Sequence, residues 1–400
     1  MKILMLTPYL PYPLLSGGQI RTYNLLKKLA SKYDVTLFAL IKEESERQYL
    51  DELQKYCKKV RLFKRSKRPF TLKNIFQTAV STFPFLVIRN YVPEATRALK
   101  EELAKEKYDL IHAETFYMMP HIPQTKVPVI LVEQTIEYLG YDSFAEKSKI
   151  PFLKSLLRVD VNKIRRWEEF YWNSCTRLIA MSNEDKEFIG KVVNDPKKID
   201  VVSNGVDVAW FAEKNKKLPA IPTVLSVGTF NWLPNVEAVK FLVQEVWPKI
   251  KAKMPETKLW IVGNAPTQEI FEYQRKDTSI TITGGIPDIR DAFAGAHVLV
   301  APVFSGKGTR YKILEAMASG TPVVATKIAV EGLGVEHGVH VLTSNTAEGI
   351  ADLALTVLQD PALQKQLAEN GRRFIESRYD WKYIAEKLDG IYKDLAHNHA

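Results

Sequence analysis

Short apolar runs alternate with longer segments of helical periodicity along the first half of the chain. The runs are rich in Val, Ile and Leu and lack the polar alternation of half-exposed strands, which predicts strands buried on both faces. We expect these strands at 2–7, 35–40, 60–63, 110–113, 129–133, 177–181 and 200–203. Apolar residues at helical spacing predict helices at 19–31, 44–56 and 158–172. This alternation is typical of βαβ units and a parallel sheet.

A second series of the same kind follows a polar interruption. The segment 209–222 carries a polar run and two prolines, Pro219 and Pro222, so we interpret it as a linker. Strands are then expected at 223–227, 258–262, 280–283, 297–301, 322–325 and 339–342. Helices are expected at 236–253, 289–294, 311–318 and 347–359, and a last one, 381–396, follows the completed second sheet.

The pattern therefore predicts an α/β protein of two doubly wound domains of similar size. We place the first domain at 1–208, the linker at 209–222, the second domain at 223–378 and a separate C-terminal helix within 379–400. Open α/β sheets bind ligands at the carboxyl ends of their strands. Two such domains facing each other form an interdomain cleft with one ligand on each side, so the strand-to-loop junctions are the places to search for function.

The net charge is +10, from 56 Lys and Arg against 46 Asp and Glu, and its whole excess lies in the first half. Residues 1–200 hold 34 basic and 24 acidic residues, whereas 201–400 hold 22 of each. Two runs concentrate the excess: 55–73, which has no acidic residue, and 147–166. The partner is a nucleic acid, an anionic membrane or a phosphate-bearing molecule, unless the runs are merely solvated surface. Few aromatic residues interleave the runs, which argues against nucleic acid.

The second basic run also has the composition of an interfacial helix. Ile150, Phe152, Leu153, Leu156 and Leu157 lie among its positive residues, as in helices that lie flat on anionic lipid. We therefore expect salt-sensitive binding to anionic vesicles through the first domain. No apolar stretch approaches the roughly 20 residues that cross a bilayer.

The cysteine content indicates a reducing compartment. Cys57 and Cys175 are too few for a disulfide scaffold or a Cys-based zinc site. The apolar run at the start of the chain is broken by Pro8, Pro11 and Pro13, unlike the core of a signal peptide. We expect a cytoplasmic protein that associates peripherally with the inner face of the membrane.

The junction at 301–322, APVFSGKGTRYKILEAMASGTP, is the strongest candidate site. A strand ends near Pro302, and the loop that follows contains Gly306, Lys307 and Gly308 before a helix for which Thr309 is the expected N-cap. Glycines let the backbone approach a ligand, and the helix N-terminus presents free N–H groups to an anion. The spacing is not that of a Walker motif, because no Ser or Thr follows the lysine.

Charged side chains on the opening turns of this helix complete the candidate. Arg310 and Lys312 add positive charge beside the loop, and the carboxylate of Glu315 is placed to reach a ribose hydroxyl. A glycine loop alone is often only a tight turn. Together with these side chains it predicts contact with a phosphate and a nucleoside.

Two further junctions are weaker candidates. Gly17 and Gly18 follow the first strand and precede the first helix, and Asn204 with Gly205 follows the last strand of the first series. The primary interpretation of both pairs is a turn in the backbone. Their places at strand ends make ligand contact the alternative reading.

At this point the motifs resemble a known family. SGG near the start, VVSNGVD at 201–207, VGTFNWLPN at 227–235 and GTRYKILEAMASGTPVVAT at 308–326 are similar to the retaining glycosyltransferases of family 4. The resemblance covers essentially the whole chain and is most specific in the second half. It implies the GT-B fold, with two Rossmann-like domains, the acceptor side first, and a crossover helix that packs back on the first domain. It also implies hexosyl transfer from a nucleoside-diphosphate sugar to an acceptor hydroxyl, with retention and without a metal or other cofactor.

The resemblance also implies residue roles. Glu315 matches the second glutamate of the family's Glu-x7-Glu motif, whereas the first position holds Lys307. In the common pattern of the family, a basic pair binds the diphosphate. That pair is missing from 229–235, so Arg310 and Lys312 are the expected substitutes. Where a histidine often follows the fifth strand this chain has Gln134, with Glu133 and Glu137 nearby, and His112 is the alternative imidazole.

Catalytic roles are thus assigned to Arg310, Lys312, Glu315 and His112. Backbone at 284–287 is expected to contact the base. Donor-binding positions are assigned to Gly17, Gly18, Asn204, Gly228, Gly263, Ile286, Gly306, Lys307, Gly308 and Thr309.

The expected function is synthesis of a cell-surface polysaccharide or glycolipid, from a carbohydrate or lipid-linked acceptor. The alternative from another class is a sugar-nucleotide epimerase on the same scaffold, similar to UDP-sugar 2-epimerases, which would release an epimer without an acceptor. The sequence identifies neither the base and sugar of the donor nor the acceptor.

Overall fold

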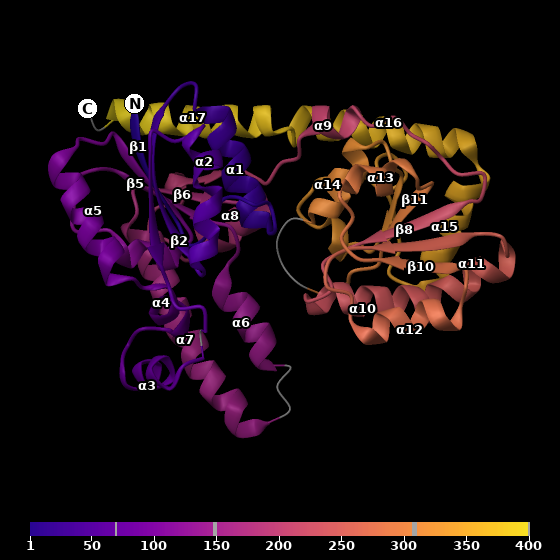
Figure 1. Cartoon of the computed structure of the whole chain (residues 1–400), viewed down its shortest axis with the longest axis horizontal. Helices are drawn as coiled ribbons and strands as arrows, with labels where there is room; N and C mark the ends of the chain where they lie inside the picture. Colours follow the sequence, from indigo (N-terminus) through magenta and orange to yellow (C-terminus); the bar gives the residue numbers. More distant parts are fainter. Residues whose placement is uncertain (69, 147–149, 306–309, 399–400) are drawn as a thin grey trace. The chain divides into compact units, whose positions relative to one another are not determined.

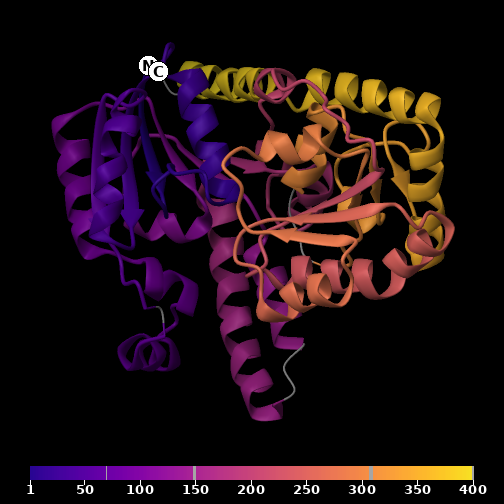
Figure 2. The same cartoon turned by 45° about the vertical axis from the view of Figure 1, so that its right-hand side comes forward.

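The computed structural model describes residues 1–68, 70–146, 150–305 and 310–398. The chain divides into two compact units, Met1–Asn204 with Ile384–Ala400, and Gly205–Tyr383. Each unit contains one parallel sheet with helices on both faces, as Figure 1 and Figure 2 show. The α/β class and the doubly wound layout expected from the sequence are confirmed.

The sheet of the first unit has seven parallel strands in the order β3-β2-β1-β4-β5-β6-β7. The order reverses between β1 and β4, which makes this the switch point where open sheets bind ligands. Residue Ile3 of β1 pairs with Val35 on one side and Leu110 on the other. The strands are β1 (Lys2–Thr7), β2 (Asp34–Ile41), β3 (Lys59–Lys64), β4 (Leu110–Glu114), β5 (Val129–Glu133), β6 (Arg177–Ala180) and β7 (Ile199–Val201).

Helices connect these strands and cover the sheet. The α-helices are α1 (Gly17–Leu29), α2 (Leu50–Gln54), α3 (Leu72–Val80), α4 (Phe85–Asn90), α5 (Pro93–Lys105), α6 (Glu137–Glu146), α7 (Pro151–Ser174) and α8 (Asn183–Gly190). Three-ten turns lie at η1 (Glu44–Tyr49), η2 (Phe116–His121) and η3 (Pro196–Lys198). The core between sheet and helices is aliphatic with a few aromatic rings, among them the fully buried Phe116 and Trp172.

The sheet of the second unit has six parallel strands in the order β10-β9-β8-β11-β12-β13, again with a reversal beside its first strand. The strands are β8 (Thr223–Val227), β9 (Lys258–Val262), β10 (Ile280–Thr283), β11 (Val298–Ala301), β12 (Val323–Ala325) and β13 (Leu342–Thr343). The helices are α9 (Val208–Ala212), α10 (Leu233–Phe241), η4 (Leu242–Val246), α11 (Trp247–Lys253), α12 (Gln268–Lys276), α13 (Ile289–Ala294), α14 (Tyr311–Ala318), η5 (Ile328–Val330), α15 (Ala347–Gln359) and α16 (Pro361–Arg378).

The last helix, α17 (Trp381–Asn398), contributes its residues from Ile384 onward to the first unit. The Tyr33 hydroxyl donates to Asp389 Oδ1 at 2.5 Å, and the hydroxyl of Tyr392 hydrogen-bonds His112 Nδ1 at 2.7 Å. Ile384, Leu388 and Leu395, spaced along one face, are buried. The first unit is therefore assembled from both ends of the sequence.

Several elements differ from the sequence expectation. The helix expected at 236–253 is interrupted by the π-turn η4, before the proline at the second position of α11. The segment expected as a linker opens with α9, and the strand expected at 339–342 pairs only from Leu342. Within the described ranges, no helix combines the length and apolar character needed to cross a bilayer.

Candidate active site

Glycines bring two strand ends of the second unit into backbone contact. Gly228 follows β8 and Gly263 follows β9, at the carboxyl edge of the sheet. Gly263 has a φ of +155°, and a Cβ at this position would lie 1.5 Å from the carbonyl oxygen of Gly228. No side chain fits there, so the two loops can approach each other only with glycine at Gly263. Ile286, after β10, packs against the core beside this edge.

Lys312 connects α14 to the loop after β8. Its ammonium donates to Asn235 Oδ1 at 2.9 Å, and Asn235 Nδ2 donates to the carbonyl of Thr229 at 2.9 Å. This loop is the region where the family's basic pair is missing. The Lys312 ammonium on α14 therefore lies at that loop, and its role as a substitute for the basic pair stays a prediction.

Burial sets the protonation of the charged residues on α14. It lowers the pKa of Lys312 to about 8, with a further decrease from Arg310 and an opposing effect of Glu315. Burial raises the pKa of Glu315 to about 7, opposed by Lys312. The pKa of Arg310 is also lowered by burial, against the charge of Glu331. Cations that are partly removed from water lose hydration free energy, and an anionic ligand compensates for that loss. The site is therefore suited to an anionic ligand.

The loop before α14 bears four of the assigned residues. Gly306, Lys307, Gly308 and Thr309 lie outside the described residues. The helix begins at Tyr311 with Arg310 as its N-cap, in a non-helical conformation (φ −87°, ψ 88°). The expected cap at Thr309 is therefore wrong by one residue, because the chain turns into the helix only after Arg310. The Arg310 guanidinium donates from Nη2 to the carbonyl of Ser305 at 3.0 Å.

In the first unit, the start of α1 faces the ends of β1 and β5. Gly17 and Gly18 open the helix, and a Cβ on Gly18 would lie 2.7 Å from both Gln134 Oε1 and the Tyr9 hydroxyl. Gln134 Nε2 donates to the Tyr9 hydroxyl at 2.6 Å, and that hydroxyl hydrogen-bonds Thr22 at 3.0 Å. The glycine is thus needed for close packing within a polar network.

Arg21 ties this network to the loop after β7. The side chain is fully buried, and Nη1 donates to the carbonyl of Ser203 at 2.8 Å and to Asn204 Oδ1 at 3.4 Å. Its Nε and Nη2 are buried without a hydrogen-bond partner in the part of the chain that the structure describes. The structure thus brings Asn204 beside α1, as expected for residues that follow strands of one parallel sheet.

His112 lies inside the same network. Its Nδ1 bonds the Tyr392 hydroxyl at 2.7 Å and its Nε2 lies 3.1 Å from Glu114 Oε1, while Gln134 Nε2 donates to Glu114 Oε2 at 2.6 Å. Burial opposes ionisation of Glu114, but His112, Arg21 and Gln134 outweigh it and hold the pKa of Glu114 below its ordinary value. With both nitrogens engaged, His112 has the geometry of a positioning residue, and its catalytic assignment stays a prediction.

The carboxylates near Gln134 serve mainly the structure of the unit. Glu168 on α7 accepts the backbone N–H groups of Glu137 and Tyr138 at 2.7 and 2.9 Å and so caps α6. Trp172 Nε1 donates to Glu133 Oε1 at 3.1 Å. Burial, then the charge of Glu168, raises the pKa of Glu133, and burial raises that of Glu137 to about 7.

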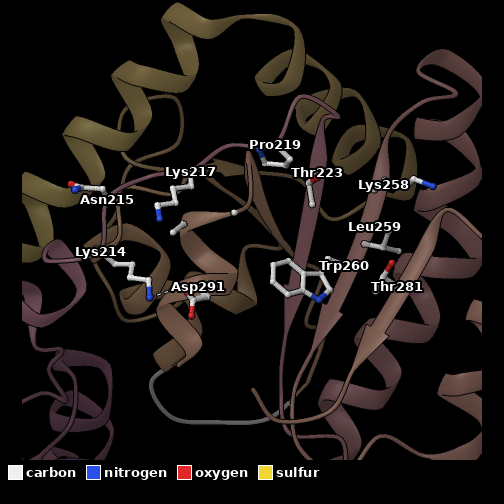
Figure 3. A pocket seen from close by; sticks show the side chains of 12 residues that line it. Lys214, Asn215, Lys217, Pro219, Thr223, Lys258, Leu259, Trp260, Thr281 and Asp291 are labelled. Atoms are coloured by element: carbon white, nitrogen blue, oxygen red, sulfur yellow. Dashed lines mark ion pairs between the residues drawn. The ribbon is translucent and has the colours of Figure 1, made fainter. Parts of the chain in front are cut away.

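A cavity of about 420 Å³ lies elsewhere in the second unit (Figure 3). Its lining includes Thr223 and Lys258, the first residues of β8 and β9, and the ring of Trp260. It therefore opens at the amino ends of the strands. Open α/β sheets bind ligands at the opposite edge, so this cavity lies away from the expected ligand site.

Comparison with known families covers both units. The model described as Glycosyltransferase Family 4 matches residues 15–210, and the model described as Glycosyl transferases group 1 matches residues 221–360. Together they span most of the chain, and the gap between them, 211–220, lies shortly after the boundary between its units. The chain belongs to the family 4 glycosyltransferases. The family expected from the sequence motifs is confirmed, and the protein is a glycosyltransferase.

Two curated relatives of this glycosyltransferase share about three quarters of its length. One is the UDP-Gal:alpha-D-GlcNAc-diphosphoundecaprenol alpha-1,3-galactosyltransferase of Escherichia coli, 25% identical over 75% of this chain and 79% of the relative. The other is the phosphatidyl-myo-inositol mannosyltransferase of Mycobacterium tuberculosis (strain H37Rv), 28% identical over 76% and 78%. Among solved structures, sucrose-phosphate synthase from Thermosynechococcus elongatus has the same fold, with a TM-score of 0.70 and 20% identity over 100% of both chains.

Sequence reasoning missed several polar residues of the glycosyltransferase. Arg21 and Glu114 carry no motif that sets them apart, since their partners are distant in sequence and appear only when the strands are assembled. Asn235 lay within a quoted motif, but its bond to Lys312 depends on α14. The signal that could have found Arg21 is a lone arginine on the otherwise buried face of α1.

Proposed function

We propose that this glycosyltransferase moves a hexose from a nucleoside-diphosphate sugar to an acceptor hydroxyl, with retention at the anomeric carbon, in the synthesis of a cell-surface polysaccharide or glycolipid. The observation that carries the proposal is the placement of Lys312 against Asn235, at the carboxyl edge of the second sheet. The relatives named as a galactosyltransferase and a mannosyltransferase support the class of sugar and the class of product.

The charged residues of α14 account for departure of the leaving group. Negative charge grows on the diphosphate as the glycosidic bond breaks, and preorganised cations lower the energy of that state. Arg310 and Lys312 supply two positive charges held partly away from water, where their effect is stronger than in bulk solvent. We propose that these residues perform this role without a metal ion. Chelation with EDTA is then expected to leave the rate of transfer unchanged.

Glu315 is proposed to bind the ribose. An ionised carboxylate accepts hydrogen bonds from two adjacent hydroxyls, and Glu315 lies about one turn after Lys312 on the helix that Arg310 caps. A uridine diphosphate sugar is the proposed donor, since the Escherichia coli relative is named for UDP-Gal. Backbone at 284–287 is proposed to contact the base.

An exposed apolar and basic surface on the first unit supports the proposed docking to anionic membranes. The surface consists of Phe70, Leu72, Ile75, Phe76, Val80, Arg68 and Lys73 on and before α3, and none of these residues is buried. Leu72 is 88% exposed and Phe76 67%. Apolar side chains insert below the lipid headgroups while cations pair with them, which commits this surface to an anionic bilayer.

The basic run at 147–166 contributes less than its composition suggested. Ile150, Leu153 and Leu156 are exposed at the start of α7, but Leu157 packs against the core. Lys154 and Arg158 both pair with Glu146, which reduces the positive charge that the run offers to lipid. Residues 147–149 and the side chain of Phe152 lie outside the described part of the structure. We propose that α3, rather than α7, makes the main contact.

The test is donor turnover by purified variants. A thermal-shift screen against UDP-, GDP-, ADP- and dTDP-sugars identifies the donor. Arg310→Ala is then expected to reduce turnover by about 10²–10³-fold, as for other groups that stabilise a developing anion. Arg275→Ala is the matched control, since Arg275 is exposed on α12 and pairs with Glu272. Wild-type turnover in Arg310→Ala would remove that residue from the site.

Product analysis separates transfer from epimerisation. Incubation with the donor alone yields an epimer of the nucleotide sugar if the enzyme is an epimerase. A glycosyltransferase yields at most slow hydrolysis to the free sugar. Release of an epimer without an acceptor would overturn the proposed function.

A further inference from the structure

A group of basic side chains in the first unit has no role in the fold described above. Lys42 follows β2, Arg65 follows β3, and the backbone N–H of Arg65 bonds the carbonyl of Ile41 at 2.9 Å. Arg89 lies on α4, which packs against η2 after β4. Lys42 and Arg65 directly follow the neighbouring parallel strands β2 and β3, and Arg89 lies beside η2, which follows β4, so all three are placed toward the carboxyl edge of the sheet.

These side chains lie close enough to repel one another. Burial lowers the pKa of Arg65, and the charge of Arg89 lowers it further. Burial, then the charge of Arg65, lowers the pKa of Lys42; Glu46 opposes this decrease, and Arg89 adds a smaller one. Three like charges held close together repel one another, and their combined field favours binding of an anion.

Residues of the first unit only partly compensate the charge and hydrogen-bonding groups of these three side chains. Nε of Arg65 and Nε of Arg89 are both buried without a hydrogen-bond partner among the described residues. Glu46 is a nearby carboxylate, but its Oε1 already accepts the backbone N–H groups of Lys42 and Glu43, at 2.6 and 2.8 Å. Buried donors left without partners cost free energy, so a ligand that accepts their hydrogen bonds is favoured.

Neutral donors surround Arg89. Burial raises the pKa of the Tyr117 phenol well above its ordinary value and that of the Tyr141 phenol to about 12, and the positive charge of Arg89 only partly opposes this effect. Both hydroxyls therefore stay protonated near neutral pH and can donate. Glu137, whose pKa burial raises to about 7, is the carboxylate on this side of Arg89.

We propose that Lys42, Arg65 and Arg89 bind the phosphate group of a phosphorylated acceptor. Guanidinium groups bind phosphate oxygens in paired hydrogen bonds, and three cations match the charge of a monophosphate or diphosphate. The proposal rests on the transfer reaction proposed above, because it names the acceptor of that reaction. Both curated relatives are named for phosphate-containing compounds, diphosphoundecaprenol and phosphatidyl-myo-inositol.

Binding of inorganic pyrophosphate by the full-length chain tests the site. Saturating UDP is present throughout, so that pyrophosphate does not occupy the donor region. Isothermal titration is expected to show binding by the wild type and a loss of at least about tenfold in Arg65→Gln and in Arg89→Gln, since each removes charged hydrogen bonds. Arg97→Gln, an exposed arginine of α5 that pairs with Glu94, is expected to bind like the wild type.

A stability measurement shows whether the variants fold. Because each substitution removes repulsion between neighbouring cations, we expect Arg65→Gln and Arg89→Gln to unfold at the same or a higher temperature than the wild type when no anion is present. Pyrophosphate is expected to raise the unfolding temperature of the wild type and of Arg97→Gln only. The proposal would be overturned if the wild type did not bind pyrophosphate, or if both arginine variants bound it as tightly as the wild type.

Competition distinguishes the sources of the phosphate. Farnesyl diphosphate in detergent micelles is compared with soluble phosphate esters, and farnesol is the phosphate-free control. If farnesyl diphosphate displaces pyrophosphate at the lower concentration, the acceptor is lipid-linked. Displacement by glucose 1-phosphate at the lower concentration assigns a soluble phosphorylated acceptor. If the arginine variants lose pyrophosphate binding while the wild type turns over no nucleotide sugar, the proposed function fails and the anion site stands.

Discussion

Two residues of α14 in the proposed donor site have pKa values close to neutral pH. The pKa of Glu315 is about 7, and the pKa of Lys312 is about 8. Below about pH 7 Glu315 is protonated and accepts hydrogen bonds from ribose less well, and above about pH 8 Lys312 loses the charge that attracts the diphosphate. We therefore expect kcat/KM for the donor to be greatest between these values and to fall on both sides, because this constant reports ionisations of the free enzyme.

Variants assign each limb of that profile. Glu315→Gln cannot titrate, so its profile is expected to lose the acidic limb, with a lower maximum. Lys312→Arg stays charged at all accessible pH values and is expected to lose the alkaline limb. An acidic limb that persists in Glu315→Gln would assign that ionisation to another group.

The contact between Gly228 and Gly263 gives a prediction about stability. Gly263→Ala would place a methyl group 1.5 Å from a carbonyl oxygen at a φ of +155°, so one of the strand ends must move. We expect a loss of at least about 2 kcal/mol in the free energy of unfolding, measured by urea denaturation. Gly284→Ala is the control, because nothing lies within 4 Å of its added Cβ. Equal stability of the two variants would contradict the close approach.

The candidate residues that a motif contains could be predicted from sequence, and the others could not. Lys312 and Glu315 share one helix and Arg310 is its N-cap, so their spacing alone puts them near one another. Arg21 reaches Ser203, and His112 reaches Tyr392, across separations that only the assembled sheet closes. Residue type alone does not reveal such partners.

At the scale of elements, the strands were predicted more completely than the helices. Buried parallel strands are short apolar runs, and that pattern is direct evidence of their environment. Helix α3 was not predicted, because its apolar residues face solvent and the spacing of those residues therefore does not indicate a face packed on a core. The break at η4 could not be foreseen either, since both flanking segments keep helical spacing.

Helix α17 depends on a buried carboxylate for its attachment to the first unit. Burial opposes ionisation of Asp389, but hydrogen bonds from Lys393, Tyr33 and Lys32 hold its pKa at about 2. The lowered pKa adds stability that is complete above the pKa of the unfolded chain and is lost as pH falls through about 2. Asp389→Asn is expected to lower the free energy of unfolding by about 2 kcal/mol at pH 7.

The exposed residue Asp394 on the same helix provides the control. Asp394→Asn is expected to unfold like the wild type at pH 7. Chemical denaturation at pH 7 and pH 3 checks both variants, and the difference between wild type and Asp389→Asn should shrink at the lower pH. A constant difference would show that Asp389 acts through packing rather than charge.

At the scale of the whole molecule, the excess charge belongs to the first half of the chain. The α3 surface adds apolar side chains to that charge, which predicts binding to vesicles that contain phosphatidylglycerol and release by added salt. Leu72→Ser with Phe76→Ser is expected to weaken pelleting at least tenfold without a change in unfolding temperature, because both side chains are exposed. Phe271→Ser, an exposed position on α12, is the control. Pelleting that is unaffected by the double substitution would exclude α3.

The division of the first unit between both parts of the sequence has a consequence for biosynthesis. A ribosome delivers Met1–Asn204 early, but the residues from Ile384 that complete this unit follow the whole of the second unit. The second unit can thus finish folding while the first still exposes the place that Asp389 and Tyr392 will occupy. Nascent chains stalled before Ile384 should therefore hold a folded second unit beside a first unit that chaperones and proteases still recognise.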